Sequence, residues 1–100
     1  MSEINRQVLV RHMAASVDGL SMQMANAAFD ALLEGMTAAL VNGKTVRLAG
    51  FGHFSPRLRP ARHTWHPRTR AAIEIPAAIV PHFSPATALR EALQSSLGEA

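Results

Sequence analysis

Arginine side chains are concentrated in one stretch of the 100-residue sequence. Between residues 47 and 81 the chain carries six arginines against the single acid Glu74, whereas the parts before and after it each have a net charge of −1. The six are Arg47, Arg57, Arg59, Arg62, Arg68 and Arg70, and they are interleaved with His63, Trp65 and His66. Guanidinium groups are planar, donate several hydrogen bonds and stay charged near neutral pH. This basic patch therefore predicts contacts with nucleic-acid phosphates and grooves, with a solvated, flexible loop as the alternative.

The sequence offers little for other kinds of chemistry. It has no cysteine, which excludes disulfides, cysteine-ligated zinc and cysteine nucleophiles. Its five histidines have no acidic or thiol partner nearby in the sequence, so we expect no metal site and no cofactor. Its seven acids are spread too widely to predict a carboxylate pair or a nucleophile–histidine–acid arrangement. We therefore expect a protein that is not an enzyme and has no small-molecule substrate.

Length and composition predict one folded domain that needs a partner chain. The mass of 10.8 kDa suits a single domain, and 48% apolar against 17% charged residues favours folding over disorder. Eighteen of the apolar residues are alanine, so few large side chains are available for a self-sufficient core, which hints at a dimer. No apolar run approaches the about 18 residues of a membrane span, and the polar N-terminus lacks a secretory signal. We expect a cytoplasmic protein without membrane association.

Two helices are predicted in the first 43 residues. Ser2 is the expected N-cap of a short first helix, and Ser21 opens a longer second one that Gly43 stops. The second has apolar side chains at the three- and four-residue spacing of an amphipathic helix, namely Ala25, Phe29, Leu32, Met36 and Leu40. We interpret this stripe as core or dimer interface.

Residues 44–83 show the alternation of side-chain types that is typical of β-strands. Gly50 and Gly52 on either side of Phe51 predict a tight bend between two strands. Beyond the bend, Arg57 and Arg59 share one face of a strand that continues into an arm, and the returning limb completes a long β-ribbon.

A C-terminal helix is predicted over residues 84–97. Ser84 is its expected N-cap and Pro85 its first residue.

Three motifs at matched separations resemble the bacterial HU/IHF family of histone-like DNA-bending proteins. They are the GFGxF bend at residues 50–54, the arginine-rich ribbon with Pro67 near its tip, and the VPxF segment at residues 80–83. The family spacing holds without a gap from residue 50 onward. The resemblance implies an α+β fold in a single domain over residues 1–100, which forms an intertwined dimer with a helical base, a β-sheet saddle and protruding β-ribbon arms.

The resemblance also implies a function. It indicates a nucleoid-associated architectural protein that binds double-stranded DNA largely without sequence specificity, condenses it and bends it by inserting its arms into the minor groove, with Pro67 as the wedge between base pairs. The implied DNA-binding residues are Arg47, Arg57, Arg59, Arg62, Trp65, His66, Pro67, Arg68, Arg70 and Arg90. The dimer partner is the same chain or a related subunit, and the residues assigned to the core and dimer interface are Phe29, Phe51, Phe54 and Phe83.

Some positions depart from the family pattern. Arg70 replaces a glycine of the arm tip, which predicts an altered turn. Trp65 stands where arginine is common, and its indole either stacks on a sugar or an unstacked base or packs on the other limb. Ser84 and Thr87 occupy positions that are usually basic, which predicts weaker and less salt-dependent DNA binding.

Two other functions stay open at this point. One is a dimeric protein-interaction or structural module with weak or lost DNA binding, suggested by the net charge of only +3. The other is an IHF-like protein that bends DNA at preferred sites through the deformability of the sequence.

Overall fold

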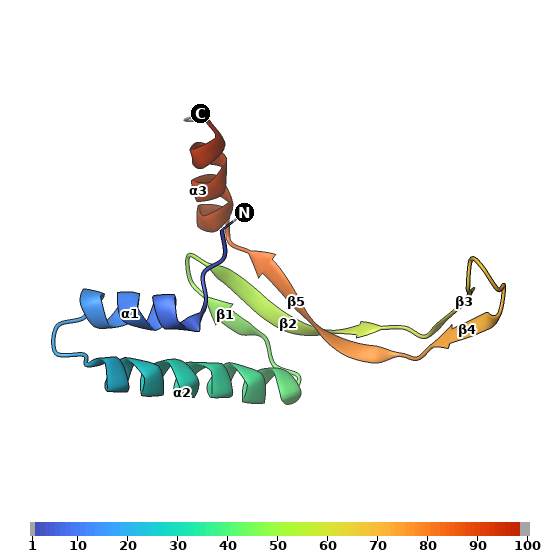
Figure 1. Cartoon of the computed structure of the whole chain (residues 1–100), viewed down its shortest axis with the longest axis horizontal. Helices are drawn as coiled ribbons and strands as arrows, with labels where there is room; N and C mark the ends of the chain where they lie inside the picture. Colours follow the sequence, from blue (N-terminus) through green and yellow to red (C-terminus); the bar gives the residue numbers. More distant parts are fainter. Residues whose placement is uncertain (1, 99–100) are drawn as a thin grey trace. The chain divides into compact units, whose positions relative to one another are not determined.

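Three helices and five antiparallel strands make up the part of the chain that the computed structural model describes, residues 2–98. The elements form an α+β fold (Figure 1). The chain divides into two compact units between Ala38 and Ala39. In this part of the chain, none of the helices combines the length and the apolar character that crossing a membrane requires.

Helices α1 (Arg6–Ser16) and α2 (Met22–Val41) begin at side-chain caps. Asn5 caps α1, because its Oδ1 accepts a hydrogen bond from the Val8 N–H at 3.1 Å. The predicted cap at Ser2 is therefore wrong, since the extended backbone of Asn5 places the helix start three residues later. Ser21 is confirmed as the cap of α2, where its Oγ accepts from the Met24 N–H at 3.1 Å.

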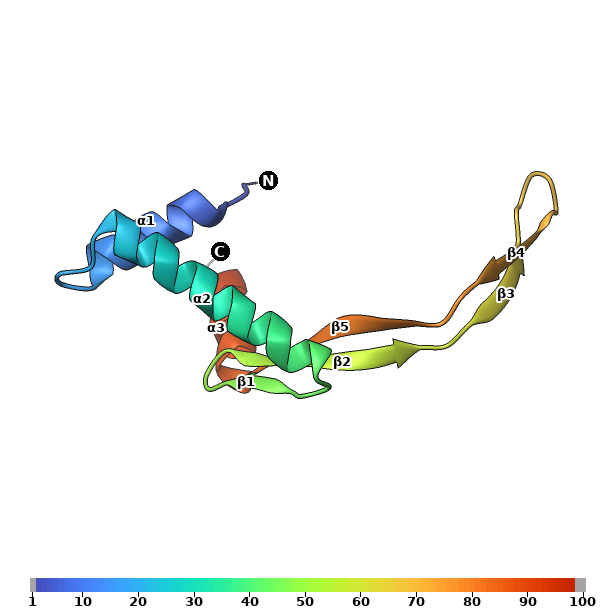
Figure 2. The same cartoon turned by 90° about the horizontal axis from the view of Figure 1, so that it is seen from below.

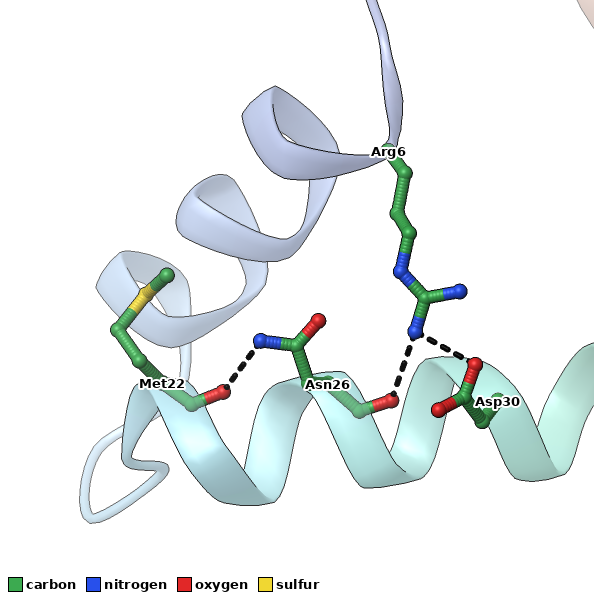
Figure 3. Close-up of polar contacts among 4 residues, drawn as sticks. All are labelled: Arg6, Met22, Asn26 and Asp30. Carbon is green, nitrogen blue, oxygen red and sulfur yellow. Dashed lines mark hydrogen bonds and ion pairs between the residues drawn. The ribbon is translucent and has the colours of Figure 1, made fainter.

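The two helices are linked by Arg6 (Figure 3). Its guanidinium pairs with the Asp30 carboxylate, donates to the Asn26 carbonyl at 3.4 Å and lies over the Phe29 ring, 5.0 Å from the centroid. These contacts fix one turn of α2 against the start of α1, although both charged side chains are about half exposed and their ion pair contributes little.

Helix α2 ends as predicted at Gly43, which adopts the left-handed conformation with φ of 78°. The Gly43 N–H donates to the Leu40 carbonyl and the Lys44 N–H donates to the Ala39 carbonyl. This pair of bonds is a Schellman cap, which satisfies carbonyls that the helix itself leaves free.

Strands β1 (Val46–Leu48), β2 (Gly52–Arg59) and β5 (Ala78–Pro85) form an antiparallel sheet in the order β1-β2-β5. The bend between β1 and β2 is the one predicted from the two glycines, and Gly50 has φ of 77°. Gly52 is required for its lack of a side chain as well as for its conformation. A Cβ there would lie 2.5 Å from the Ser84 carbonyl oxygen and 2.8 Å from the Phe83 ring.

The predicted β-ribbon is confirmed, and it is interrupted once (Figures 1 and 2). Strands β3 (Arg62–Trp65) and β4 (Ala72–Ile75) pair with each other beyond β2 and β5 and carry the ribbon to its tip. The interruption contains a proline on each limb, Pro60 after β2 and Pro76 before β5. Proline supplies no N–H to a ladder, which explains why regular pairing stops there.

Helix α3 (Thr87–Gly98) begins two residues after Pro85, which the sequence predicted as its first residue. Ser84 and Pro85 continue strand β5, where they lie opposite His53 and Gly52. The Ala86 N–H then donates to the Phe51 carbonyl, and the Ala86 carbonyl accepts the first helical bond from Arg90. The assignment of Ser84 as the N-cap is therefore wrong, because strand pairing holds this segment extended.

A single chain buries very little apolar surface. Within the described residues only Val10 and Ala25 are fully buried hydrophobic side chains. Large apolar side chains remain more than one third exposed in both units, among them Leu9, Leu32, Leu33, Phe51, Leu58, Ile79, Phe83 and Leu93.

Candidate nucleic-acid interface

The β1-β2-β5 sheet has one polar and one apolar face. Side chains alternate between faces along a strand, and directly opposite residues share a face. The register therefore places seven polar residues on one face, together with Ala78 and Val80, and we call it the polar face. The seven are Arg47, His53, Ser55, Arg57, Arg59, His82 and Ser84. The register equally defines an apolar face made of Val46, Leu48, Phe54, Pro56, Leu58, Ile79, Pro81 and Phe83.

Within residues 2–98, no carboxylate neutralises the arginines of the polar face. Arg57 and Arg59 lie opposite Val80 and Ala78, which carry no charge. Over residues 2–98 the one ion pair joins Arg6 and Asp30, far from the ribbon in sequence. Arg47 shares the face through its pairing with His53, so three guanidinium groups lie on one face of the sheet, with Arg47 at its β1 end and Arg57 and Arg59 toward the ribbon.

The ribbon tip is a compact turn built on His66. The His66 N–H donates to the Ala71 carbonyl at 3.0 Å, and the Arg70 N–H donates to the His66 carbonyl at 2.8 Å. The His66 imidazole closes the turn from inside, where Nδ1 accepts from the backbone N–H groups of Arg68 at 3.1 Å and Thr69 at 3.4 Å. An accepting Nδ1 requires an imidazole with its proton on Nε2 alone.

Arg70 supplies the left-handed residue that ends the turn. Its φ is 60°, the only positive φ among the non-glycine residues of the described chain. The turn therefore has a left-handed residue without the glycine, because the arginine itself adopts that conformation. That conformation costs an ordinary residue about 1–2 kcal/mol, which the bonds to His66 offset here.

Pro67 and Arg68 occupy the exposed top of the turn, next to His66. The ring of Pro67 has no N–H to satisfy and is free of the ladder, so it is available as a rigid apolar wedge. Thr69 supports the turn, since its Oγ1 accepts from the Ala71 N–H at 3.3 Å.

The remaining candidate residues occupy different places. Arg62 and Trp65 are exposed at the two ends of β3, on the ribbon. Arg90 is exposed on α3, which follows the end of β5 farthest from the tip, and it lines a shallow depression with Thr87, Glu91 and Gln94. Arg90 is therefore not brought together with the ribbon arginines by any contact among the described residues.

Three of the four phenylalanines form a cluster at the start of β2. The Phe83 ring lies 5.5 Å from that of Phe51 and 4.7 Å from that of Phe54. Phe51 and Phe83 stay more than one third exposed, so the cluster packs internally and still presents a free side. Phe29 is half-buried on α2, beneath Arg6.

Sequence reasoning missed the polar residues that complete the polar face, namely His53, Ser55, His82 and Ser84. The signal was present in the alternation of residues 78–85, but Ser84 was assigned to a helix cap instead. The turn role of His66 was also missed, because a histidine that accepts from the two following amides has no signature in composition or spacing. No group of three or more histidine and acidic side chains that could hold a metal occurs within residues 2–98.

Comparisons with known proteins agree on one family. The model of a family described as "Bacterial DNA-binding protein" matches residues 4–94. The DNA-binding protein HU of Geobacillus stearothermophilus is 44% identical over 80 residues, which cover 80% of this chain and 89% of the relative. The integration host factor subunit beta of Halorhodospira halophila is 36% identical over 97 residues, which cover 97% and 95%. The Anabaena HU–DNA cocrystal structure superposes with a TM-score of 0.81 at 37% identity, covering 90% of this chain and 97% of that one.

Proposed function

The chain belongs to the bacterial DNA-binding protein family of HU and integration host factor, and we propose that it binds and bends nucleoid DNA through its ribbon. It is an architectural DNA-binding protein of that family. The observation that carries the proposal is the row of arginines along the polar face and ribbon, none of which is neutralised by a carboxylate in residues 2–98. We assign it the architectural and non-catalytic role of the family.

The ribbon contacts DNA in two ways. Guanidinium groups of Arg57, Arg59 and Arg62 neutralise phosphates and enter the narrow minor groove, where the negative potential is strongest. Arg47, Arg68, Arg70 and Arg90 add phosphate contacts, the first from the sheet and the last from α3. His53, His82 and Ser84 of the polar face supply hydrogen bonds to the same backbone.

The turn presents Pro67 as the wedge. A rigid ring without an N–H can enter between two base pairs and partly unstack them, which kinks the duplex toward the major groove. His66 holds the turn that positions the ring, and it is exposed enough to contact the groove itself.

Dimer formation completes the fold. A chain with two fully buried apolar side chains in its described residues cannot fold stably alone, because apolar burial is the main source of stability. A second copy, or a related subunit, covers the apolar face and the exposed side of the Phe51, Phe54 and Phe83 cluster. Each dimer then presents two ribbons, one for each side of a DNA duplex.

A salt series of binding to a fluorescently labelled duplex tests the proposal. The intact dimer should bind with an affinity that falls steeply with salt, since each neutralised phosphate contributes about 0.9 to the slope. A variant with Arg59, Arg62, Arg68 and Arg70 changed to Ala should show lower affinity and a shallower slope. Arg59→Ala should weaken binding more than Arg11→Ala, which removes the same charge from α1 and serves as its control.

Failure of the intact dimer to bind at low salt would refute the proposal and favour a protein-interaction role. Site preference is tested separately by competition between random and A-tract duplexes. We expect little preference, because most of the proposed contacts are to phosphates, which every duplex presents alike. Strong preference for one duplex would indicate an IHF-like function.

A further inference from the structure

The indole of Trp65 is exposed near the ribbon tip. Trp65 is the last residue of β3, directly before the His66 turn, and it lies opposite Ala72. A single methyl group cannot cover an indole, and Trp65 is 68% exposed. The sequence left open whether this side chain packs on the other limb, and the register with Ala72 makes that packing poor.

The surroundings of Trp65 select the kind of surface it fits. Arg68 and Arg70 belong to the turn that follows Trp65 directly, and the acid on this hairpin is Glu74, which lies opposite His63, one pair farther from the tip on the same face. A partner that satisfies both features must carry negative charge and flat apolar surfaces side by side. DNA does so, because a phosphate backbone flanks stacked bases, whereas an apolar protein surface would leave the arginines unmatched.

We propose that Trp65 is a base-stacking residue, which stacks on the base exposed where Pro67 opens the base step. This rests on the proposed DNA binding of the ribbon. The Trp65 contact adds to the free energy of DNA binding a contribution that comes from the bases. This contribution does not depend on counterion release, because stacking neutralises no phosphate. It thus compensates in part for Ser84 and Thr87, which carry no charge at positions that are usually basic in the family.

The chain is suited to a direct test, because Trp65 is its only tryptophan and tyrosine is absent. Emission of the intact dimer should therefore be quenched by a duplex oligonucleotide, and DNA should protect it from acrylamide. Polyphosphate, which offers charge without bases, should bind the arginines and leave the emission nearly unchanged. Unchanged emission at saturating duplex would overturn the stacking contact.

Variants separate stacking from charge. Trp65→Ala should lower duplex affinity about 5- to 150-fold while the salt slope stays the same. Trp65→Phe should restore a large part of the affinity, and Trp65→Leu, which is apolar but cannot stack, should not. Equal affinities for the intact protein and Trp65→Ala would overturn the inference.

The outcomes distinguish this inference from the proposed function. Labelled-duplex anisotropy that does not change at low salt refutes DNA binding altogether, whereas normal anisotropy with unchanged Trp65 emission refutes stacking alone. Indole and arginine also suit anionic membranes, so vesicles containing phosphatidylglycerol are the comparison. A spectral change with vesicles but not with DNA would assign Trp65 to lipid and overturn the inference.

Discussion

Pro56 lies directly opposite Pro81 in the β2–β5 ladder. Neither residue has an N–H, so the pair occupies a position at which the backbone groups of the two strands point away from each other. Alternation then makes Arg57 and Val80 a hydrogen-bonded pair. Phe51 and Ala86 lie an even number of residues from Arg57 and Val80, so the alternation predicts that they also form a hydrogen-bonded pair. The Ala86 N–H does donate to the Phe51 carbonyl. Pro56 also lies beyond the last β1 pairing, Val46 with Phe54, so its nitrogen leaves no ladder bond unmade.

Moving a proline by one residue should therefore disrupt the ribbon. Val80→Pro removes a donor from a hydrogen-bonded pair and should destabilise the protein by about 1–3 kcal/mol. Pro81→Ala adds a donor that faces outward and should change stability by less than about 1 kcal/mol. Urea denaturation at one fixed protein concentration measures both. Equal effects of the two substitutions would contradict the register argument.

Gly52→Ala should be among the most damaging single-methyl additions to the chain. The new Cβ would meet the Ser84 carbonyl oxygen and the Phe83 ring, at a φ of 153° that side chains rarely adopt. We expect a destabilisation of about 2–4 kcal/mol, seen as a lower Tm. Gly50→Ala is the control, because Gly50 also has a positive φ but nothing lies within 4 Å of its Cβ position. Gly50→Ala should destabilise the protein by about 1–2 kcal/mol. If it destabilised the protein as much as Gly52→Ala does, the positive φ and not the steric clash would explain the effect at Gly52.

Replacing His66 should loosen the ribbon tip without unfolding the dimer. His66→Ala removes the acceptor for the Arg68 and Thr69 amides, a change comparable to removal of a helix cap, about 0.5–2 kcal/mol. Hydrogen exchange at those two amides should become faster, and duplex affinity should fall. His66→Asn keeps a side-chain acceptor at short reach and should behave nearly as the intact protein does. Unchanged exchange in His66→Ala would show that the imidazole does not close the turn.

Arg70 combines two effects that substitutions can separate. Arg70→Gly should relieve the left-handed strain at φ of 60° and slow exchange of the Ala71 amide, while it takes a guanidinium away from the DNA backbone. We expect lower duplex affinity, with a salt slope that is smaller by about one unit for each phosphate that is no longer neutralised. Arg70→Lys should keep the slope. A salt slope unchanged in Arg70→Gly would remove Arg70 from the interface.

Much of the fold could be predicted from local signals. The stop at Gly43 and the bend at Gly50 and Gly52 each require a backbone conformation that few residues adopt. The cap at Ser21 requires a short side-chain acceptor, so the sequence shows all of them directly. The alternation of Arg57 and Arg59 likewise fixes their common face once a strand is assumed.

The errors arose where two local signals competed. Ser84-Pro85 is a strong helix start, yet pairing with Gly52 and His53 holds it in a strand, and that long-range partner is invisible in the local sequence. Ser2 and Asn5 are both good caps, and the choice depends on where the chain first packs. At the tip, His66 and Arg70 perform roles usually given to asparagine and glycine, so a search for the usual residues overlooks them.

Because one chain has almost no core of its own, the stability of this protein depends on its concentration. Folding and pairing are a single second-order process when Val10 and Ala25 are the fully buried hydrophobic side chains of the described residues. Dilution then acts as a denaturant, and each tenfold rise in subunit concentration adds about 1.4 kcal/mol to the stability of the dimer. A cell that changes how much of this chain it makes changes, in the same act, how much of it is folded.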